Sequence, residues 1–197
     1  PPRIAYRETI TAPAEGHHRH KKQTGGAGQF GEVFLKIEPL PRGSGFEFLD
    51  QVKGGAIPYN FMPAVEKGVR MALEAGVVAG YPVVDLRVIV YDGKHHTVDS
   101  KEIAFTTAGR KAFVDGIKNA RPVLLEPYVN VEITAPARHM GDITGDLSGK
   151  RGRVQTTEML GNDMCLIRAS APMGEFHNYS GQLKSMTGGV GTFVMEY

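Results

Sequence analysis

Residues 17–31 read HHRHKKQTGGAGQFG, and this stretch decides which fold the first part of the chain can adopt. Gly26, Gly28 and Gly31 form a literal GxGxxG. A dinucleotide-binding fold needs a hydrophobic strand before such glycines and a helix after them, because the pyrophosphate lies at the helix N-terminus. Here a basic run precedes the glycines and the β-type run EVFLKIE (32–38) follows them. The stretch therefore predicts a solvated basic arm with no strand before the glycines, and it excludes a dinucleotide site.

Outward from this stretch, the first part of the chain alternates strand and helix patterns. Strands are expected at 3–11, 32–38, 46–53 and 83–91, and helices at 63–75 and from about 99 to 119. The first helix has one apolar face, formed by Val65, Val69, Ala72 and Leu73. Asp99 and Glu102 form a capping signature for the second helix. Its expected core contacts are Ile103, Thr107, Phe113 and Ile117.

Pro122 interrupts this pattern, and a second unit begins near Val123. Its expected elements are a strand at 128–134, a helix at 137–147, a basic loop at 148–152, strands at 153–159 and 164–170, a helix at 174–186 and a strand at 192–196. This βαββαβ order is that of a ferredoxin-like domain. The sequence therefore predicts an α+β protein with two domains, 1–122 and 123–197.

Composition sets the broad class of the protein. The chain has 197 residues, enough to bury a core in two domains of about 100 residues each. The net charge of +2 is too small to indicate nucleic-acid binding. Only a local cluster of basic residues could indicate it. A single cysteine, Cys165, excludes an internal disulfide and favours a cytoplasmic location. No apolar run reaches the ~18–20 residues of a membrane span, so no membrane partner is expected.

The residues do not predict a catalytic centre or a metal site. The run GDLSGK (145–150) has too few residues between its glycines for a P-loop, and Arg151 follows its lysine instead of a hydroxyl. His17, His18 and His20 lie among cationic side chains, where a metal ion is poorly placed. We therefore expect the chain not to be an enzyme and to hold no metal or cofactor of its own.

Two basic loops of the first unit remain as candidate binding elements. One is 17–31 and the other is the turn at 92–96. Lysines and arginines there would bind phosphates, and Gln29 could hydrogen-bond base edges or 2′-hydroxyls in the shallow minor groove of RNA. The alternative interpretation is two solvated loops without a ligand.

Several motifs in chain order carry a resemblance to a known family. They are KKQTGGAGQFG (21–31), GGAIPYNFMPAVEKG (54–68), AGYPVVDLRV (79–88), HHTVDSKEIAF (95–105), PVLLEPYVNVEITAP (122–136), MGDITGDLSGKRG (140–152) and LKSMTGGVGTFVMEY (183–197). Together they resemble the fourth and fifth domains of bacterial translation elongation factor G, a ribosome-dependent GTPase that drives translocation of tRNA and mRNA. The resemblance implies a monomeric, ribosome-binding fragment. GTP and Mg²⁺ would then bind only in N-terminal domains that this sequence does not include.

The resemblance also implies a fold and a set of site residues. The first domain would be similar to domain 2 of ribosomal protein S5, and the second would be ferredoxin-like. The tip of the first domain would hold the mRNA–tRNA helix in the decoding site through Lys21, Lys22, Gly25, Gly26, Gly28, Gln29, Phe30, Gly31, Lys94, His95, His96 and Asp99. In the second domain, Ser148, Lys150, Arg151 and Gly152 would face ribosomal RNA.

Some positions depart from the family pattern. Ala27 stands where the family often has arginine or serine. Gly149 and Lys150 stand where it often has arginine, and His95 replaces a common tyrosine. These differences leave a second role open, that of a divergent paralogue that acts in ribosome recycling or in protection of the ribosome from tetracycline. A stand-alone enzyme that uses a nucleotide or a metal is the alternative from a different class.

Overall fold

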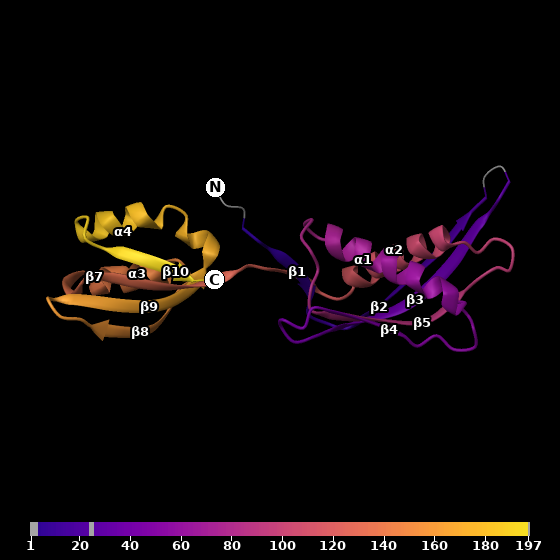
Figure 1. The fold of residues 1–197 in the computed structure, drawn as a ribbon, viewed down its shortest axis with the longest axis horizontal. Helices are drawn as coiled ribbons and strands as arrows, with labels where there is room; N and C mark the ends of the chain where they lie inside the picture. Colours follow the sequence, from indigo (N-terminus) through magenta and orange to yellow (C-terminus); the bar gives the residue numbers. More distant parts are fainter. Residues whose placement is uncertain (1–3, 24–25, 197) are drawn as a thin grey trace. The chain divides into compact units, whose positions relative to one another are not determined.

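The computed structural model describes residues 4–23 and 26–196, which form two compact units (Figure 1). The first unit is Tyr6–Leu125, and the second contains residues 4–5 and 126–196. The boundary lies after Leu125, later than the position expected from Pro122, because Pro122–Leu125 forms strand β6 and pairs with β1 (Arg7–Ile10). Among the residues described, no helix is long and apolar enough to cross a membrane.

The first unit is a four-stranded sheet with two helices on one face (Figure 1). Its strands are β2 (Ala14–Lys22), β3 (Gln29–Pro39), β4 (Phe46–Asp50) and β5 (Leu86–Lys94), in the spatial order β2-β3-β5-β4. The pairs β2–β3 and β3–β5 are antiparallel, and β4 runs parallel to β5. The short helix η1 (Tyr59–Phe61) leads into α1 (Met62–Ala75), and α2 is Glu102–Lys118.

The prediction of a basic arm without a strand was wrong. Residues 17–22 belong to β2, whose register with β3 runs from Ala14 opposite Ile37 to Lys22 opposite Gln29. The missed signal is the alternation along β2, where the buried or half-buried Gly16, His18 and His20 alternate with exposed residues. A strand therefore does precede the glycines, but strand β3 and not a helix follows them, so the helix N-terminus that binds a pyrophosphate is not formed at this turn.

Helix α2 begins later than the capping signature predicts. Its N-cap is Lys101, and no side chain caps it. Asp99 lies outside the helix because its carbonyl accepts a hydrogen bond from the Phe30 N–H, 2.9 Å away. Of the expected core contacts, Ile103 is 53% exposed, whereas Phe113 and Ile117 are buried as predicted.

The buried face of α2 is rich in small residues, which sets how closely the helix packs on the sheet. Ala108, Ala112 and Gly116 lie on this face, and they let the helix approach β2 closely. A Cβ placed at Gly16 would clash with the backbone of Ala112 and Gly116. In α1 the predicted apolar face is confirmed, since all four of its residues are buried.

The second unit is ferredoxin-like, as predicted. Its elements are β7 (Tyr128–Pro136), η2 (Ala137–His139), α3 (Met140–Gly149), β8 (Arg153–Met159), β9 (Met164–Pro172), η3 (Met173–Phe176), α4 (Tyr179–Thr187) and β10 (Thr192–Glu196). The antiparallel sheet has the order β10-β7-β9-β8, and one core joins both helices to one face of it. Helix α3 continues through Gly149, so Ser148 lies in the helix and not in the expected loop.

Candidate nucleic-acid interface

Two segments meet at one end of the first unit, the start of β3 and the residues between β5 and α2 (Figure 1). Phe30 forms an isolated bridge with Ser100. The Ser100 hydroxyl donates to the Phe30 carbonyl, 3.2 Å away, and accepts a hydrogen bond from the His96 N–H at 2.8 Å. These bonds join the start of β3 to the segment between β5 and α2. We call this end of the first unit the tip, and we define it by the residues Lys21, Lys22, Gly26, Gly28, Gln29, Phe30, Gly31, Lys94, His95, His96 and Asp99.

Phe30 is the buried anchor of the tip. It is 2% exposed, and its ring stacks on the exposed His96 imidazole with centroids 3.7 Å apart. The Arg19 guanidinium lies 5.4 Å from the centroid of the same ring, within the range of a cation–π contact. Phe30 therefore supports other side chains and is not itself presented to a ligand. Arg19 is not among the site residues predicted from the sequence. The alternation of side chains along β2 could have identified it, because it puts Arg19 on the same face of the strand as Lys21.

The glycines of the tip have different local roles. Gly28 is buried, and a Cβ there would lie 3.0–3.1 Å from the Asp99 carboxyl group. Gly31 packs against Phe105, where a Cβ would meet the ring at 3.2 Å. Gly26 is exposed with a φ of 139°, a conformation that L side chains rarely adopt. Gly25 lies outside the described residues. The close approach to Asp99 therefore depends on Gly28, and the close approach of β3 to α2 depends on Gly31.

Polar groups of the tip are partly engaged within the protein. The Gln29 amide oxygen lies 2.9 Å from His20 Nε2 on the neighbouring strand. The His95 Nδ1 atom lies 3.1 Å from the Ala56 carbonyl. Lys21, Lys22 and Lys94 are exposed. Their side chains therefore present positive charge to solvent.

Two histidines of β2, His17 and His18, lie near charged neighbours. Burial and the nearby cationic Lys111 lower the pKa of His18, so its imidazole is neutral near pH 7. His17 Nε2 lies 2.6 Å from a Glu32 carboxylate oxygen. Within the residues described, no group of three or more histidine, cysteine or carboxylate side chains could hold a metal ion.

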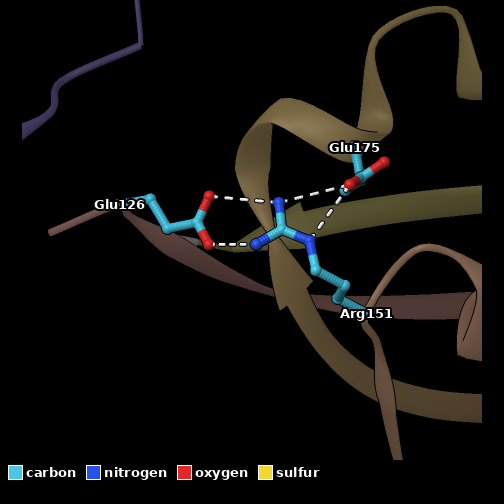
Figure 2. Close-up of polar contacts among 3 residues, drawn as sticks. All are labelled: Glu126, Arg151 and Glu175. Carbon is cyan, nitrogen blue, oxygen red and sulfur yellow. Dashed lines mark hydrogen bonds and ion pairs between the residues drawn. The ribbon is translucent and has the colours of Figure 1, made fainter. Parts of the chain in front are cut away.

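The predicted RNA-facing residues of the second unit are already paired. The Lys150 ammonium lies 3.0 Å from Asp146 Oδ1 and 5.7 Å from the centroid of the Tyr179 ring. Arg151 lies between two glutamates, Glu126 and Glu175 (Figure 2). Ser148 donates its hydroxyl to the Thr144 carbonyl, and the Gly152 N–H donates to the Leu147 carbonyl. An RNA phosphate would have to compete with these carboxylates for Lys150 and Arg151.

Comparisons with known proteins match both units. Residues 2–121 match the family model "Elongation factor G, domain IV", and residues 123–197 match "Elongation factor G C-terminus". The chain is 50% identical over 196 residues to the elongation factor G-like protein of Thermotoga maritima and to elongation factor G of Aquifex pyrophilus. These matches cover 100% of the chain but only 29% and 28% of the two relatives.

A solved structure agrees with these matches. A crystal structure of a protein from Thermus thermophilus is similar, with a TM-score of 0.83 and 40% sequence identity. The similarity covers 99% of the chain and 29% of the solved protein. The chain thus spans less than a third of the length of the relatives that it matches.

Proposed function

Because the chain belongs to the elongation factor G family, we propose that it is the ribosome-contacting part of a translational GTPase that promotes translocation of tRNA and mRNA. The matched models are domain IV and the C-terminal domain, and the GTPase domain is not among them. GTP hydrolysis and its Mg²⁺ therefore belong, in this proposal, to domains that the chain does not include. The proposed partners are the ribosome and those other domains, the location is cytoplasmic, and the chain acts as a monomer.

The observation that carries this proposal is the junction of two basic segments through Phe30. In the register of the sheet, Lys21 lies opposite Phe30, Lys22 opposite Gln29 and Lys94 opposite Glu32. The His96 imidazole stacks on Phe30. Lysines bind phosphates without regard to sequence, and Gln29 and His96 offer hydrogen bonds to ribose or base edges. A translocation factor must accept every codon, so it needs contacts that do not depend on base sequence, to the RNA backbone and to the shape of the helix. The tip therefore suits the mRNA–tRNA helix in the decoding site.

The second unit contributes a weaker contact in this proposal. Residues 148–152 would face ribosomal RNA, but Lys150 and Arg151 are already paired with carboxylates. If an RNA phosphate replaces a carboxylate as the partner of Lys150 or Arg151, the gain in binding free energy is small, because ion pairs near solvent are weak. We therefore expect the tip to dominate the electrostatic part of ribosome binding.

The dependence of ribosome binding on salt tests the tip assignment. Binding of the chain should weaken steeply as salt rises, because phosphate contacts release counterions. Replacing Lys21, Lys22 and Lys94 together by alanine should reduce the slope of log K against log[salt] by about 1 per lysine. The matched control replaces Lys67, Lys111 and Lys118, three exposed lysines of α1 and α2 outside the tip. Equal slopes for the tip variant and the control would overturn the assignment.

A further inference from the structure

The sheet of the first unit has one face toward α1 and α2 and a second face away from them, which we call the open face. On β2, Gly16 lies on the helix side, because a Cβ there would clash with the backbone of α2. On β5, Gly93 lies on the same side, because a Cβ there would meet the core residue Ile57. Side chains alternate between the two faces along a strand, so residues an odd number of positions from these glycines lie on the open face.

Three cationic side chains lie on the open face at the tip end of the sheet. By this alternation they are Arg19 and Lys21 of β2 and Lys94 of β5, and all three are exposed. In the register of the sheet, Arg19 and Lys94 lie opposite Glu32 from its two sides, and Lys21 lies opposite Phe30. The three cations therefore surround the first residues of β3 on one face.

The carboxylate between these cations is engaged elsewhere. Glu32 is 7% exposed, and its Oε2 atom lies 2.6 Å from His17 Nε2. Within the described ranges 4–23 and 26–196, Arg19, Lys21 and Lys94 form no ion pair with a carboxylate. This end of the open face therefore carries positive charge that is complementary to a polyanion.

Arg19 is positioned by the same ring that positions His96. Its guanidinium lies 5.4 Å from the centroid of the Phe30 ring, and the His96 imidazole stacks on that ring at 3.7 Å. Phe30 is buried, so one ring of β3 supports two exposed polar side chains from different segments. A guanidinium presents its N–H donors in a planar fork that matches the oxygens of a phosphate. Arg19 thus offers a phosphate-binding group that is held at the tip.

We propose that Arg19 is a further RNA-binding residue of the tip, and that the phosphates it binds lie on the open face together with those bound by Lys21 and Lys94. This inference rests on the function proposed above, to which it adds a residue and the face of the sheet that the RNA contacts. At Gly31 the helix side of the same end is already covered by Phe105 of α2. The open face is therefore the side of the sheet on which these cations can meet RNA.

The salt dependence of ribosome binding tests this role with single variants. Arg19→Ala should reduce the slope of log K against log[salt] by about 1, because one phosphate contact is lost. Arg121→Ala is the matched control, since Arg121 is an exposed arginine of the first unit outside the tip, and it should leave the slope unchanged. Arg19→Lys should keep the slope, because it keeps the charge. Equal slopes for the wild type and Arg19→Ala would overturn the proposal, and so would a reduced slope for Arg19→Lys.

Photo-crosslinking identifies the class of molecule that Arg19 contacts. Arg19 is replaced by the photoreactive residue p-benzoylphenylalanine, and the chain is irradiated in complex with ribosomes. The expected product is a crosslink to RNA, which ribonuclease removes. A crosslink to ribosomal protein alone would overturn the assignment of RNA as the partner.

The outcomes separate this role from the proposed function of the tip. If Arg19→Ala keeps the slope while the variant of Lys21, Lys22 and Lys94 reduces it, the role of Arg19 fails and the proposed function stands. If neither variant changes the slope, both fail. Circular dichroism checks that each variant is folded, and Arg19→Gln, which keeps a long polar side chain without the charge, carries the test if Arg19→Ala does not fold.

Discussion

The imidazole of His96 lies flat on the ring of Phe30, with the ring centroids 3.7 Å apart and the planes inclined by 3°. The two residues come from segments that are far apart in the chain, and Phe30 is the buried member of the pair. The position of the exposed His96 ring therefore depends on the packing of β3.

We first predict that His96→Ala or Gln29→Ala, in a full-length protein that carries this chain, slows translocation about tenfold. Loss of one hydrogen bond worth ~1.4 kcal/mol gives a change of that size. Ribosome-stimulated GTP hydrolysis should be spared, because the GTPase site lies in a different domain. Rapid kinetics of both steps measure the difference. Val78→Ala, which changes a 57% exposed residue outside the tip, should alter neither step. Equal loss of both activities would contradict the tip assignment.

The second prediction concerns the contact between α1 and α2. A Cβ at Gly68 would clash with the Thr106 carbonyl, which is backbone and cannot turn away. Gly68→Ala should therefore lower the free energy of unfolding of the first unit by about 1–3 kcal/mol or more. Gly145→Ala in α3 is the control, because nothing lies within 4 Å of its added Cβ. It should stabilise the second unit by about 0.5–1 kcal/mol, since alanine favours helices. Urea unfolding measures both, and an undiminished stability of Gly68→Ala would refute the close contact.

The third prediction concerns the buried carboxylate of Glu8, which is 1% exposed. It accepts hydrogen bonds from the backbone N–H groups of Val77, Val78, Ala79 and Tyr81 at 2.7–3.0 Å. Burial by itself raises the pKa of Glu8, but these four bonds outweigh it, so the pKa lies below its ordinary value of 4.5. Glu8→Gln should cost about 1–3 kcal/mol at pH 7, because it removes charge-assisted bonds.

The sign of the pH effect follows from this lowered pKa. The unfolded chain takes up the Glu8 proton at a higher pH than the folded chain does. The stabilisation from Glu8 is therefore complete above about pH 4.5 and is lost as the pH falls through the folded pKa. Acid unfolding of the wild type should be steeper in this range than that of Glu8→Gln. Some acid sensitivity should remain in the variant, because hydrogen bonds from Gly43, Gly45 and Arg42 also lower the pKa of Asp85. Identical pH profiles would contradict the assignment to Glu8.

The fourth prediction concerns Tyr179, whose hydroxyl has no hydrogen-bond partner among the residues that the structure describes. Burial and the nearby Asp146 raise the pKa of Tyr179 to about 12. The folded state therefore holds this proton above the ordinary pKa of 10, and stability falls as the pH rises from 10 to 12. Tyr179→Phe should remove the part of the stability loss at alkaline pH that comes from this hydroxyl. It should leave the stability at pH 7 unchanged or slightly higher. Unfolding at about pH 7 and about pH 11 measures both effects, and destabilisation at neutral pH would reveal a partner for the hydroxyl.

Local sequence patterns predicted many of the helices and strands. They failed where a contact with a residue far away in the sequence sets the bounds of an element. The strands at 153–159 and 192–196 have the predicted bounds, and the helix expected at 63–75 is α1, which begins at Met62. Residues 17–22 were missed as a strand because their half-buried side chains are histidines and not apolar residues. The start of α2 was misplaced because the Asp99 carbonyl bonds to Phe30, which no local rule anticipates.

The sequence by itself determined the α+β class, the ferredoxin-like order of the second unit and the exclusion of a dinucleotide site. These follow from short-range periodicity and from what comes directly before and after the glycines. Only the tertiary structure decided that Phe30 lies beneath His96 and that Arg151 binds Glu126 and Glu175. The physical reason is that the sequence shows which residues are cationic, but not which residues they contact in the folded chain. Whether it meets solvent, a phosphate or a carboxylate depends on which distant residue the fold brings within hydrogen-bond distance.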